Sequence, residues 1–183
     1  MYFINTQNQS IKLNTYDLNK EEVNKTISLP LSKYSFQNTQ HHLINLYDKS
    51  HKILYLIQPD SPFKPLQESL NNVENSFWLN DENIIYTDNF EIWKFNLNSG
   101  EKTLLTRISS EIENIIAHPK NNYILFLANN TINVLELDDR EKYNITKILE
   151  LKDIKNLMID EKGDTIYFSS QIGSQKGIFK LAI

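Results

Sequence analysis

The sequence predicts an all-β protein built from repeated antiparallel sheets. Short apolar stretches with strand-like alternation are separated by polar turns along most of the 183-residue chain. A strand–turn–strand pattern with an aromatic residue in its second strand occurs four times. The composition, 40% hydrophobic and 23% charged, is that of a globular chain long enough for one domain, or at most two small ones.

The four copies of the pattern define a repeat. Without gaps, Leu43–Ile57 superimposes on Asn114–Ala128, and the pattern recurs in Ser76–Thr87 and Asn156–Ser169. The aromatic residues of the four copies are separated by 31, 40 and 42 residues: Tyr55, Tyr86, Phe126 and Phe168. A period close to 40 with strand-like content is typical of the blades of a β-propeller.

Each repeat continues with further strands. The expected third strands are Glu91–Leu97, Thr131–Leu137 and Lys176–Ile183. A polar hairpin follows the first of them, where Gly100 supplies a positive φ. The expected fourth strands are Lys102–Thr106 and Asn144–Leu149. Four strands joined by tight turns form an antiparallel sheet that must stack on its neighbours to bury both faces.

The ends of the chain are less regular. Residues 1–30 contain three expected strands and no first strand. Pro62 and Pro65 stand where the second repeat should have its third strand, and a short helix is expected at Pro65–Asn71. Ser109–Ile115 fits either a short helix or the turn into a strand. We expect a single domain, 1–183, that is a ring of about five irregular blades or part of a larger propeller. Its approximate units are 1–36, 37–75, 76–109, 110–150 and 151–183.

Three stretches resemble the bacterial WD-like β-propellers related to the Tol-associated and peptidase propellers: Ile92–Glu101, Ile116–Phe126 and Met158–Ser170. More narrowly, Glu91–Arg107 and Leu135–Asn144 look like propellers that follow a membrane anchor and a PEGA domain. This narrower resemblance implies an extracytoplasmic, membrane-anchored protein with a possible cell-envelope polymer as partner. The anchor and the PEGA domain would then lie outside this sequence.

Composition limits the function classes. The net charge of −4 argues against a dedicated binder of nucleic acid or anionic membranes. Because the chain has no cysteine, disulfides and zinc–cysteine sites are excluded. The sequence contains no run of 18 apolar residues, the length that a helix needs to span a bilayer. Met1–Asn5 lacks the pattern of a signal peptide.

The histidines do not predict a metal site. His41, His42 and His51 form the main cluster, but adjacent strand residues point to opposite faces and no further ligand is evident. The cluster is therefore expected to be a polar turn before a strand. His118 is expected to be a turn residue as well, since it precedes Pro119 where the other repeats have turns.

Acidic pairs are the other candidates for chemistry. They occur at Asp81–Glu82, Asp138–Asp139 and Asp160–Glu161, where solvated turn residues are expected rather than two carboxylates facing each other. Nucleophile-elbow, phosphate-loop and dinucleotide motifs are missing. We therefore expect no enzyme, no catalytic residue and no cofactor.

Two tryptophans could anchor a partner. Trp93 is expected in the core between blades, and Trp78, nearer a turn, is a weaker core candidate. The leading hypothesis is a recognition scaffold that binds a protein, a peptide or a cell-envelope partner through its loops. The alternative is a propeller hydrolase or lyase with a carboxylate-lined funnel. A third possibility is self-association through open edge strands.

Overall fold

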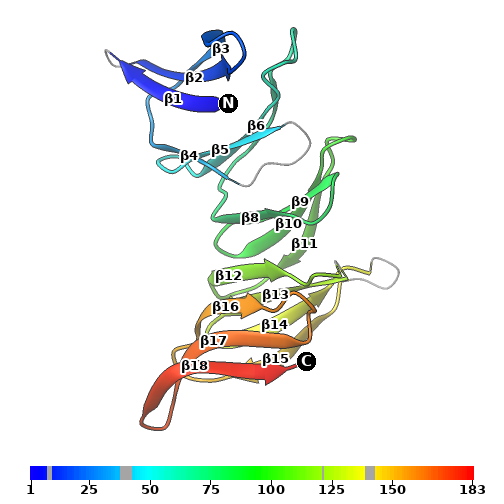
Figure 1. The fold of residues 1–183 in the computed structure, drawn as a ribbon. Coiled ribbons are helices and arrows are strands. Elements are labelled where there is room, and N and C mark those ends of the chain that lie inside the picture. The colour runs from blue at the N-terminus through cyan, green and yellow to red at the C-terminus, as the bar shows by residue number, and fades with distance from the viewer. Residues whose placement is uncertain (8–9, 38–42, 121, 139–142) are drawn as a thin grey trace. The chain divides into compact units, whose positions relative to one another are not determined.

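The computed structural model describes residues 1–7, 10–37, 43–120, 122–138 and 143–183. These residues form 18 strands and no helix (Figure 1). The part of the chain that is described therefore has no helix long and apolar enough to cross a membrane. The chain divides into two compact units, Met1–Val73 and Glu74–Ile183, and each is described by itself.

The first unit contains two antiparallel sheets. One has the order β1-β2-β3, formed by β1 (Tyr2–Gln7), β2 (Ser10–Asp17) and β3 (Glu22–Leu29). The other has the order β4-β5-β6-β7, formed by β4 (Tyr34–Phe36), β5 (Ile44–Asp48), β6 (Ile53–Ile57) and β7 (Leu66–Leu70). Their shared core is built around four buried aliphatic side chains: Leu13, Ile44, Leu46 and Ile57.

The second unit contains three sheets that follow one another along the chain, from green to red in Figure 1. The first is formed by β8 (Asn75–Trp78), β9 (Asn83–Thr87), β10 (Glu91–Asn96) and β11 (Lys102–Arg107). The next is formed by β12 (Ile112–Ala117), β13 (Tyr123–Ala128), β14 (Thr131–Glu136) and β15 (Ile145–Glu150). The last is formed by β16 (Lys155–Ile159), β17 (Thr165–Ile172) and β18 (Gln175–Ala182).

The sheet β12–β15 is apolar on both faces. On one face, Ile124 and Phe126 pack with residues of β8–β11, among them Ile85 and Ile92. On the other face, Leu125 and Leu127 pack with residues of β16–β18, among them Phe168. Burial on both sides explains why β13 reads as a continuous apolar run rather than an alternating one.

The repeat is regular in the structure. Four residues separate the end of each sheet from the start of the next, after Leu29, Leu70, Arg107 and Glu150. The second strands of the last four sheets start at Ile44, Asn83, Tyr123 and Thr165, which are 39, 40 and 42 residues apart. The predicted all-β class with incomplete terminal sheets is confirmed, since three sheets have four strands and the first and last have three.

One anchor residue was predicted in the wrong strand. Tyr86, Phe126 and Phe168 lie in the second strands of their sheets, but Tyr55 lies in β6, the third strand of its sheet. The residue at the matching place is Tyr47, the fourth residue of β5. The gapless superposition slipped by one strand because every hairpin in such a sheet has the same apolar–polar–apolar pattern.

The helix predicted at Pro65–Asn71 is also wrong. Leu66–Leu70 forms β7 and pairs with β6, so the second sheet is complete despite its prolines. Pro59, Pro62 and Pro65 lie in the loop before β7, where a missing N–H costs no ladder hydrogen bond. The ambiguous stretch at Ser109–Ile115 leads into strand β12.

The hairpin turns explain part of the high asparagine content. At five turns an Asp or Asn side-chain oxygen accepts hydrogen bonds from the backbone N–H groups two and three residues later. These residues are Asp17, Asp48, Asn80, Asp88 and Asn96. Each such turn closes a hairpin locally, so the strand order follows from nearby residues.

Candidate binding surface

The structure places His51 in a capped turn. His51 follows β5, and its Nδ1 lies 2.9 Å from Oδ2 of the buried Asp48. Asp48 also accepts hydrogen bonds from the Ser32 hydroxyl and from two backbone N–H groups. Burial acts to raise the pKa of Asp48, but these hydrogen bonds outweigh it and lower the pKa. His41 and His42 lie outside the described residues, and the described residues contain no cluster of three metal-ligating side chains.

His118 lies in a turn, as predicted, but it is buried and joins two sheets. Its Nδ1 accepts a hydrogen bond from the Lys120 N–H at 3.2 Å, which leaves Nε2 to donate to the Gly163 carbonyl at 3.2 Å. Its ring stacks on Tyr123, with 4.0 Å between centroids. Because both ring nitrogens and one ring face are engaged within the protein and the residue is buried, His118 is a structural residue.

The acidic pairs lie in turns between strands. Asp81 and Glu82 are exposed between β8 and β9, and Asp138 is exposed after β14. Oδ1 of Asp160 accepts the N–H groups of Asp164 and Thr165, which caps the turn before β17. Asp139 lies outside the described residues.

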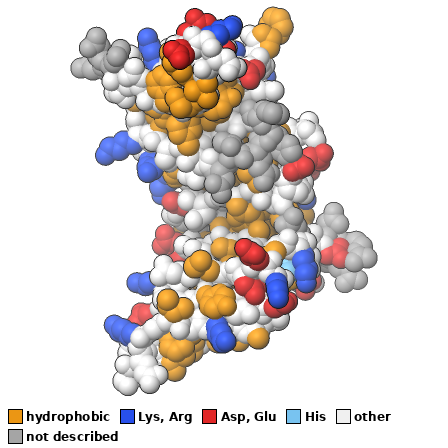
Figure 2. Space-filling view, viewed as in Figure 1, with side chains coloured by type: hydrophobic (Ala, Val, Ile, Leu, Met, Phe, Trp, Pro, Cys, Tyr) orange, Lys and Arg blue, Asp and Glu red, His pale blue; other side chains and the backbone are white. Residues whose placement is uncertain are grey.

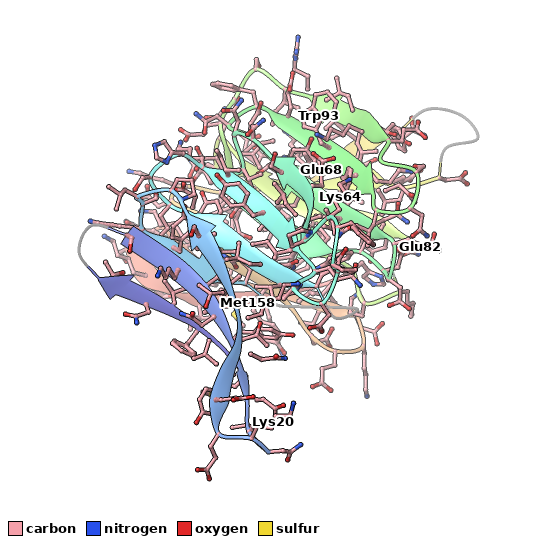
Figure 3. The ribbon with its side chains drawn as sticks, turned by 90° about the horizontal axis from the view of Figure 1, so that it is seen from above. Lys20, Lys64, Glu68, Glu82, Trp93 and Met158 are labelled. Carbon is pink, nitrogen blue, oxygen red and sulfur yellow. The ribbon has the colours of Figure 1, made fainter. Side chains whose placement is uncertain are left out.

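The tryptophans differ from the expected core position. Trp93 is half-buried in β10, where its ring stacks on Tyr86 at 6.4 Å between centroids and its Nε1 donates to Glu91. Glu91 also pairs with Arg107 across the hairpin, and this hydrogen bond is the main reason that the pKa of Glu91 is lowered. Trp78 is half-buried at the end of β8. Figure 3 labels Trp93 among the side chains of these strands.

The sheet β16–β18 offers an exposed face. One face packs on β12–β15 through Ile166 and Phe168. In the antiparallel register, Met158, Tyr167 and Lys180 form one cross-strand row on the opposite face. These three side chains are exposed, and Figure 2 shows hydrophobic, basic and acidic side chains mixed at this end of the chain.

A second and a third row complete this face. Lys155, Ser169 and Ile178 form the second row, and Gln171 pairs with Lys176 in the third. Ile178 is 80% exposed, although it is a large aliphatic side chain in the middle of a strand. We call the residues of the three rows the open face. The described rows carry three lysines and no carboxylate.

The open face differs from the equivalent face of the preceding sheet. At the matching positions β13 and β14 have four apolar side chains, Leu125, Leu127, Ile132 and Val134, and the next sheet covers them. At these positions β17 and β18 have Tyr167, Ser169, Ile178 and Lys180. Half of the apolar patch has become polar, so the open face is amphipathic rather than purely apolar.

A shallow cleft of about 590 Å³ lies on this face. Its walls include Asp153 and Lys155 on one side, Ser169 and Gln171 below, and Lys176 on the other side. The pairing of β16 with β17 is irregular here, with a register shift between Lys155 and Met158. The Ser169 hydroxyl holds this irregular segment by donating to the Lys155 carbonyl at 3.0 Å.

Sequence reasoning missed the open face, although its signal is present in the sequence. In β17, Tyr167, Ser169 and Gln171 alternate with Ile166, Phe168 and Ser170. In β18, Lys176, Ile178 and Lys180 share one face by the same period of two. Only the strand register shows that the two series lie on the same side of the sheet.

Comparisons with known proteins place the fold. No family model matches the chain, and no curated protein matches it. Among solved structures, the C-terminal WD40 domain of Sif2 is similar with a TM-score of 0.66 and 15% identity, covering 100% of this chain and 54% of that one. Hsv2p of Kluyveromyces lactis is similar with a TM-score of 0.63 and 11% identity, covering 91% of this chain and 58% of that one.

An enzyme-related propeller is also similar. A candidate 6-phosphogluconolactonase from Bacteroides uniformis has a TM-score of 0.57 and 12% identity, covering 100% of this chain and 64% of that one. The chain thus spans between half and two thirds of the length of these structures. At identities this low the likeness concerns the fold. In its sheets, strand order and repeat length, the chain therefore has a WD-like β-propeller fold.

Proposed function

We propose that the protein is a non-enzymatic recognition scaffold that binds a protein or peptide partner. The observation that carries this proposal is the open face of β16–β18, where exposed Met158, Tyr167 and Ile178 alternate with lysines. Large exposed apolar side chains rimmed by polar ones are typical of protein interaction sites. The stacked sheets behind this face hold it rigidly, which lowers the entropic cost of binding.

We further propose that the partner belongs to the cell envelope and that the protein is bacterial, extracytoplasmic and membrane-anchored. This part rests on the resemblance of Glu91–Arg107 and Leu135–Asn144 to propellers linked to a PEGA domain. Fractionation of cells that express the native gene tests it. Recovery of the protein with membranes, accessible to protease from outside, is the expected result, and recovery in the cytoplasmic fraction would contradict it.

The scaffold function is tested by selection from a displayed library of random peptides against the full chain. We expect enriched peptides that bind saturably, with one site per chain by calorimetry. The alternative, a hydrolase or lyase, predicts turnover of lactone or glycoside substrates and no enriched peptide. A library that yields no saturable binder would contradict the scaffold function.

A further inference from the structure

We propose that the loop between β6 and β7 is a second contact site, which inserts the ring of Phe63 into an apolar pocket of a different folded protein. The inference goes beyond the proposed function, because it assigns a site in the first unit and the shape of the partner that fits it. The loop comprises residues 58–65, with the sequence Gln-Pro-Asp-Ser-Pro-Phe-Lys-Pro. In Figure 1 it extends past the ends of the two strands that it joins.

The base of the loop is fixed to the neighbouring sheet. Pro59 is buried, and its carbonyl accepts a hydrogen bond from the ammonium group of Lys25. The same ammonium group donates to the Ser61 carbonyl at 3.3 Å. Lys25 belongs to β3, so one charged side chain connects the loop with the sheet β1–β3. Because hydrogen bonds from a charged donor are stronger than those between neutral groups, this contact holds the base of the loop in place.

Hydrogen bonds within the loop hold its backbone. The Gln58 N–H donates to the Pro65 carbonyl at 2.7 Å, which brings the two ends of the loop together. The Ser61 N–H donates to the Gln58 carbonyl at 3.1 Å, and the Ser61 hydroxyl accepts the Lys64 N–H at 3.4 Å. Prolines at 59, 62 and 65 fix φ at their own positions. The loop therefore has little backbone freedom to lose when a partner binds.

Three residues form the tip of the loop. Pro62, Phe63 and Lys64 are exposed, and Phe63 is 96% exposed. Single apolar residues on a surface are common and need no explanation. Here, however, the anchored backbone keeps a large aromatic ring in solvent, whereas a flexible loop could fold the ring back onto the sheet. Aromatic residues are enriched in the cores of protein interfaces, where they act as anchors.

The shape of the tip decides the class of partner. A ring that projects from a narrow loop is enclosed only by a concave surface, which a folded protein provides and an extended peptide does not. The turn between Gln58 and Ser61 differs from the extended polyproline helix that proline-binding grooves recognise. A second copy fits poorly, because charged and polar side chains, among them Asp153 and Lys155, form most of the walls of the cleft on the open face.

The charges of the loop refine this choice. Residues 58–65 contain one acidic and one basic side chain, Asp60 and Lys64, so the loop has no net charge. Attachment to an anionic membrane is favoured by an excess of positive charge beside the apolar residues, which this loop lacks. Lys64 follows Phe63 directly, so an acidic group at the rim of the partner's pocket would pair with Lys64 and orient the ring.

Photo-crosslinking in cells that express the native gene tests the proposal. The photoreactive p-benzoylphenylalanine replaces Phe63 in the full chain. In a control it replaces Lys20, which is exposed in the turn of the β2–β3 hairpin and labelled in Figure 3. We expect one protein to be crosslinked at position 63 and not at position 20. Mass spectrometry identifies this protein, which is then purified for binding measurements.

Calorimetry with the purified partner measures the part played by the ring. Phe63→Ser should weaken binding at least about tenfold, because the partner's pocket loses its anchor. Lys64→Glu should slow association, an effect that added salt reduces. The matched control is Leu18→Ser, which removes an apolar side chain that is 68% exposed in the same unit and should leave binding unchanged. Thermal unfolding of all three variants should match the original, which excludes misfolding as the cause.

Three outcomes would overturn the inference and leave the scaffold function standing. The first is that no protein is crosslinked at position 63, and crosslinked lipid alone would make a membrane the occupant. The second is a crosslink to another copy of this chain. The third is that the purified partner binds Phe63→Ser as tightly as the original. The scaffold function is judged separately, because peptides selected from the library should bind Phe63→Ser unchanged, and a library without any binder rejects that function whatever the result at Phe63.

Discussion

At the turn between β12 and β13, the buried His118 ring contacts the backbone of Gly163, which lies 45 residues later in the turn before β17. Gly163 has a φ of +82°, and a Cβ there would lie 2.2 Å from Nε2 of His118. The positive φ favours glycine because other residues rarely adopt it, and the short distance requires glycine because a Cβ would collide with the His118 ring. The pair thus ties the two sheets together at one end.

Gly163→Ala should therefore destabilise the second unit by about 2–5 kcal/mol, the sum of left-handed backbone strain and overpacking. Gly173→Ala is the matched control. Gly173 has a φ of +61° but nothing within 4 Å of its Cβ position, so only the backbone strain of about 1–2 kcal/mol applies. Urea unfolding of both variants measures the difference, and equal losses would contradict the role of His118.

Asp48 makes stability depend on pH. The pKa of Asp48 in the folded protein is lowered from the ordinary value of 3.8. Its ionised form therefore adds to the free energy of unfolding above pH 3.8, and this stabilisation is lost as the pH falls through the pKa of the folded state. Asp48→Asn should cost about 1–2 kcal/mol at pH 7 through the lost charge-assisted hydrogen bonds. Below pH 3.8 the difference between the two proteins should shrink. Thermal unfolding at pH 7 and pH 3 tests this, and a constant difference would refute it.

At the scale of single elements, residues within each hairpin stabilise its own turn. Asn96 ends β10, and its Oδ1 accepts the N–H groups of Asn98 and Ser99, which closes the turn to β11. Gly100 completes that turn at a φ of +73°. Asp17 caps the β2–β3 hairpin in the same way, with Glu21 at a φ of +54° in the place of the glycine.

Replacing Asn96 by alanine should cost about 1–2 kcal/mol, because two backbone donors lose their acceptor. Asn96→Asp should cost less than alanine, because a carboxylate accepts the same two hydrogen bonds, as Asp17 does, although it loses the bond that Asn96 Nδ2 donates to Asn83 at 3.1 Å. Chemical denaturation of both variants, with amide exchange at β10 and β11, distinguishes them. If alanine and aspartate have the same effect, the cap does not stabilise the hairpin.

Within the second unit, stability comes from the contacts of each sheet with the next. Phe126 is 1% exposed and belongs to the core between β8–β11 and β12–β15, whereas Leu125 belongs to the core on the other side. In such arrays the free energy is approximately a sum of repeat and neighbour terms. A core substitution should therefore loosen one interface more than the other.

Phe126→Ala should destabilise by about 3–5 kcal/mol through lost burial and the remaining cavity. Faster amide exchange is expected in β9 and β10 before β17, because the core with β8–β11 is the one affected. Leu125→Ala is the comparison and should instead loosen β16–β18 first. Uniform loosening of all three sheets by either variant would show that the unit opens as one.

For the protein as a whole, the sequence predicts strands and turns well, since these depend on near neighbours. The period of two, the Asp and Asn caps and the spacing near 40 residues indicate an all-β repeat. The helix expected at Pro65–Asn71 failed because a strand after a proline-rich loop depends on its partner β6, which local propensity does not describe. The assignment of Tyr55 to a second strand failed for the same reason, since adjacent hairpins have similar sequences and only strand pairing distinguishes them.

By itself, the amino-acid order determined the class of the fold, its repeat and the hairpins, because local backbone preferences and alternation act over a few residues. Tertiary structure decided which face of each strand is covered. It alone brings His118 to Gly163, and it alone gathers Lys155, Tyr167, Ile178 and Lys180 on one side of a sheet. Such contacts depend on strand register, and a shift of one residue would turn every side chain of a strand to the opposite face.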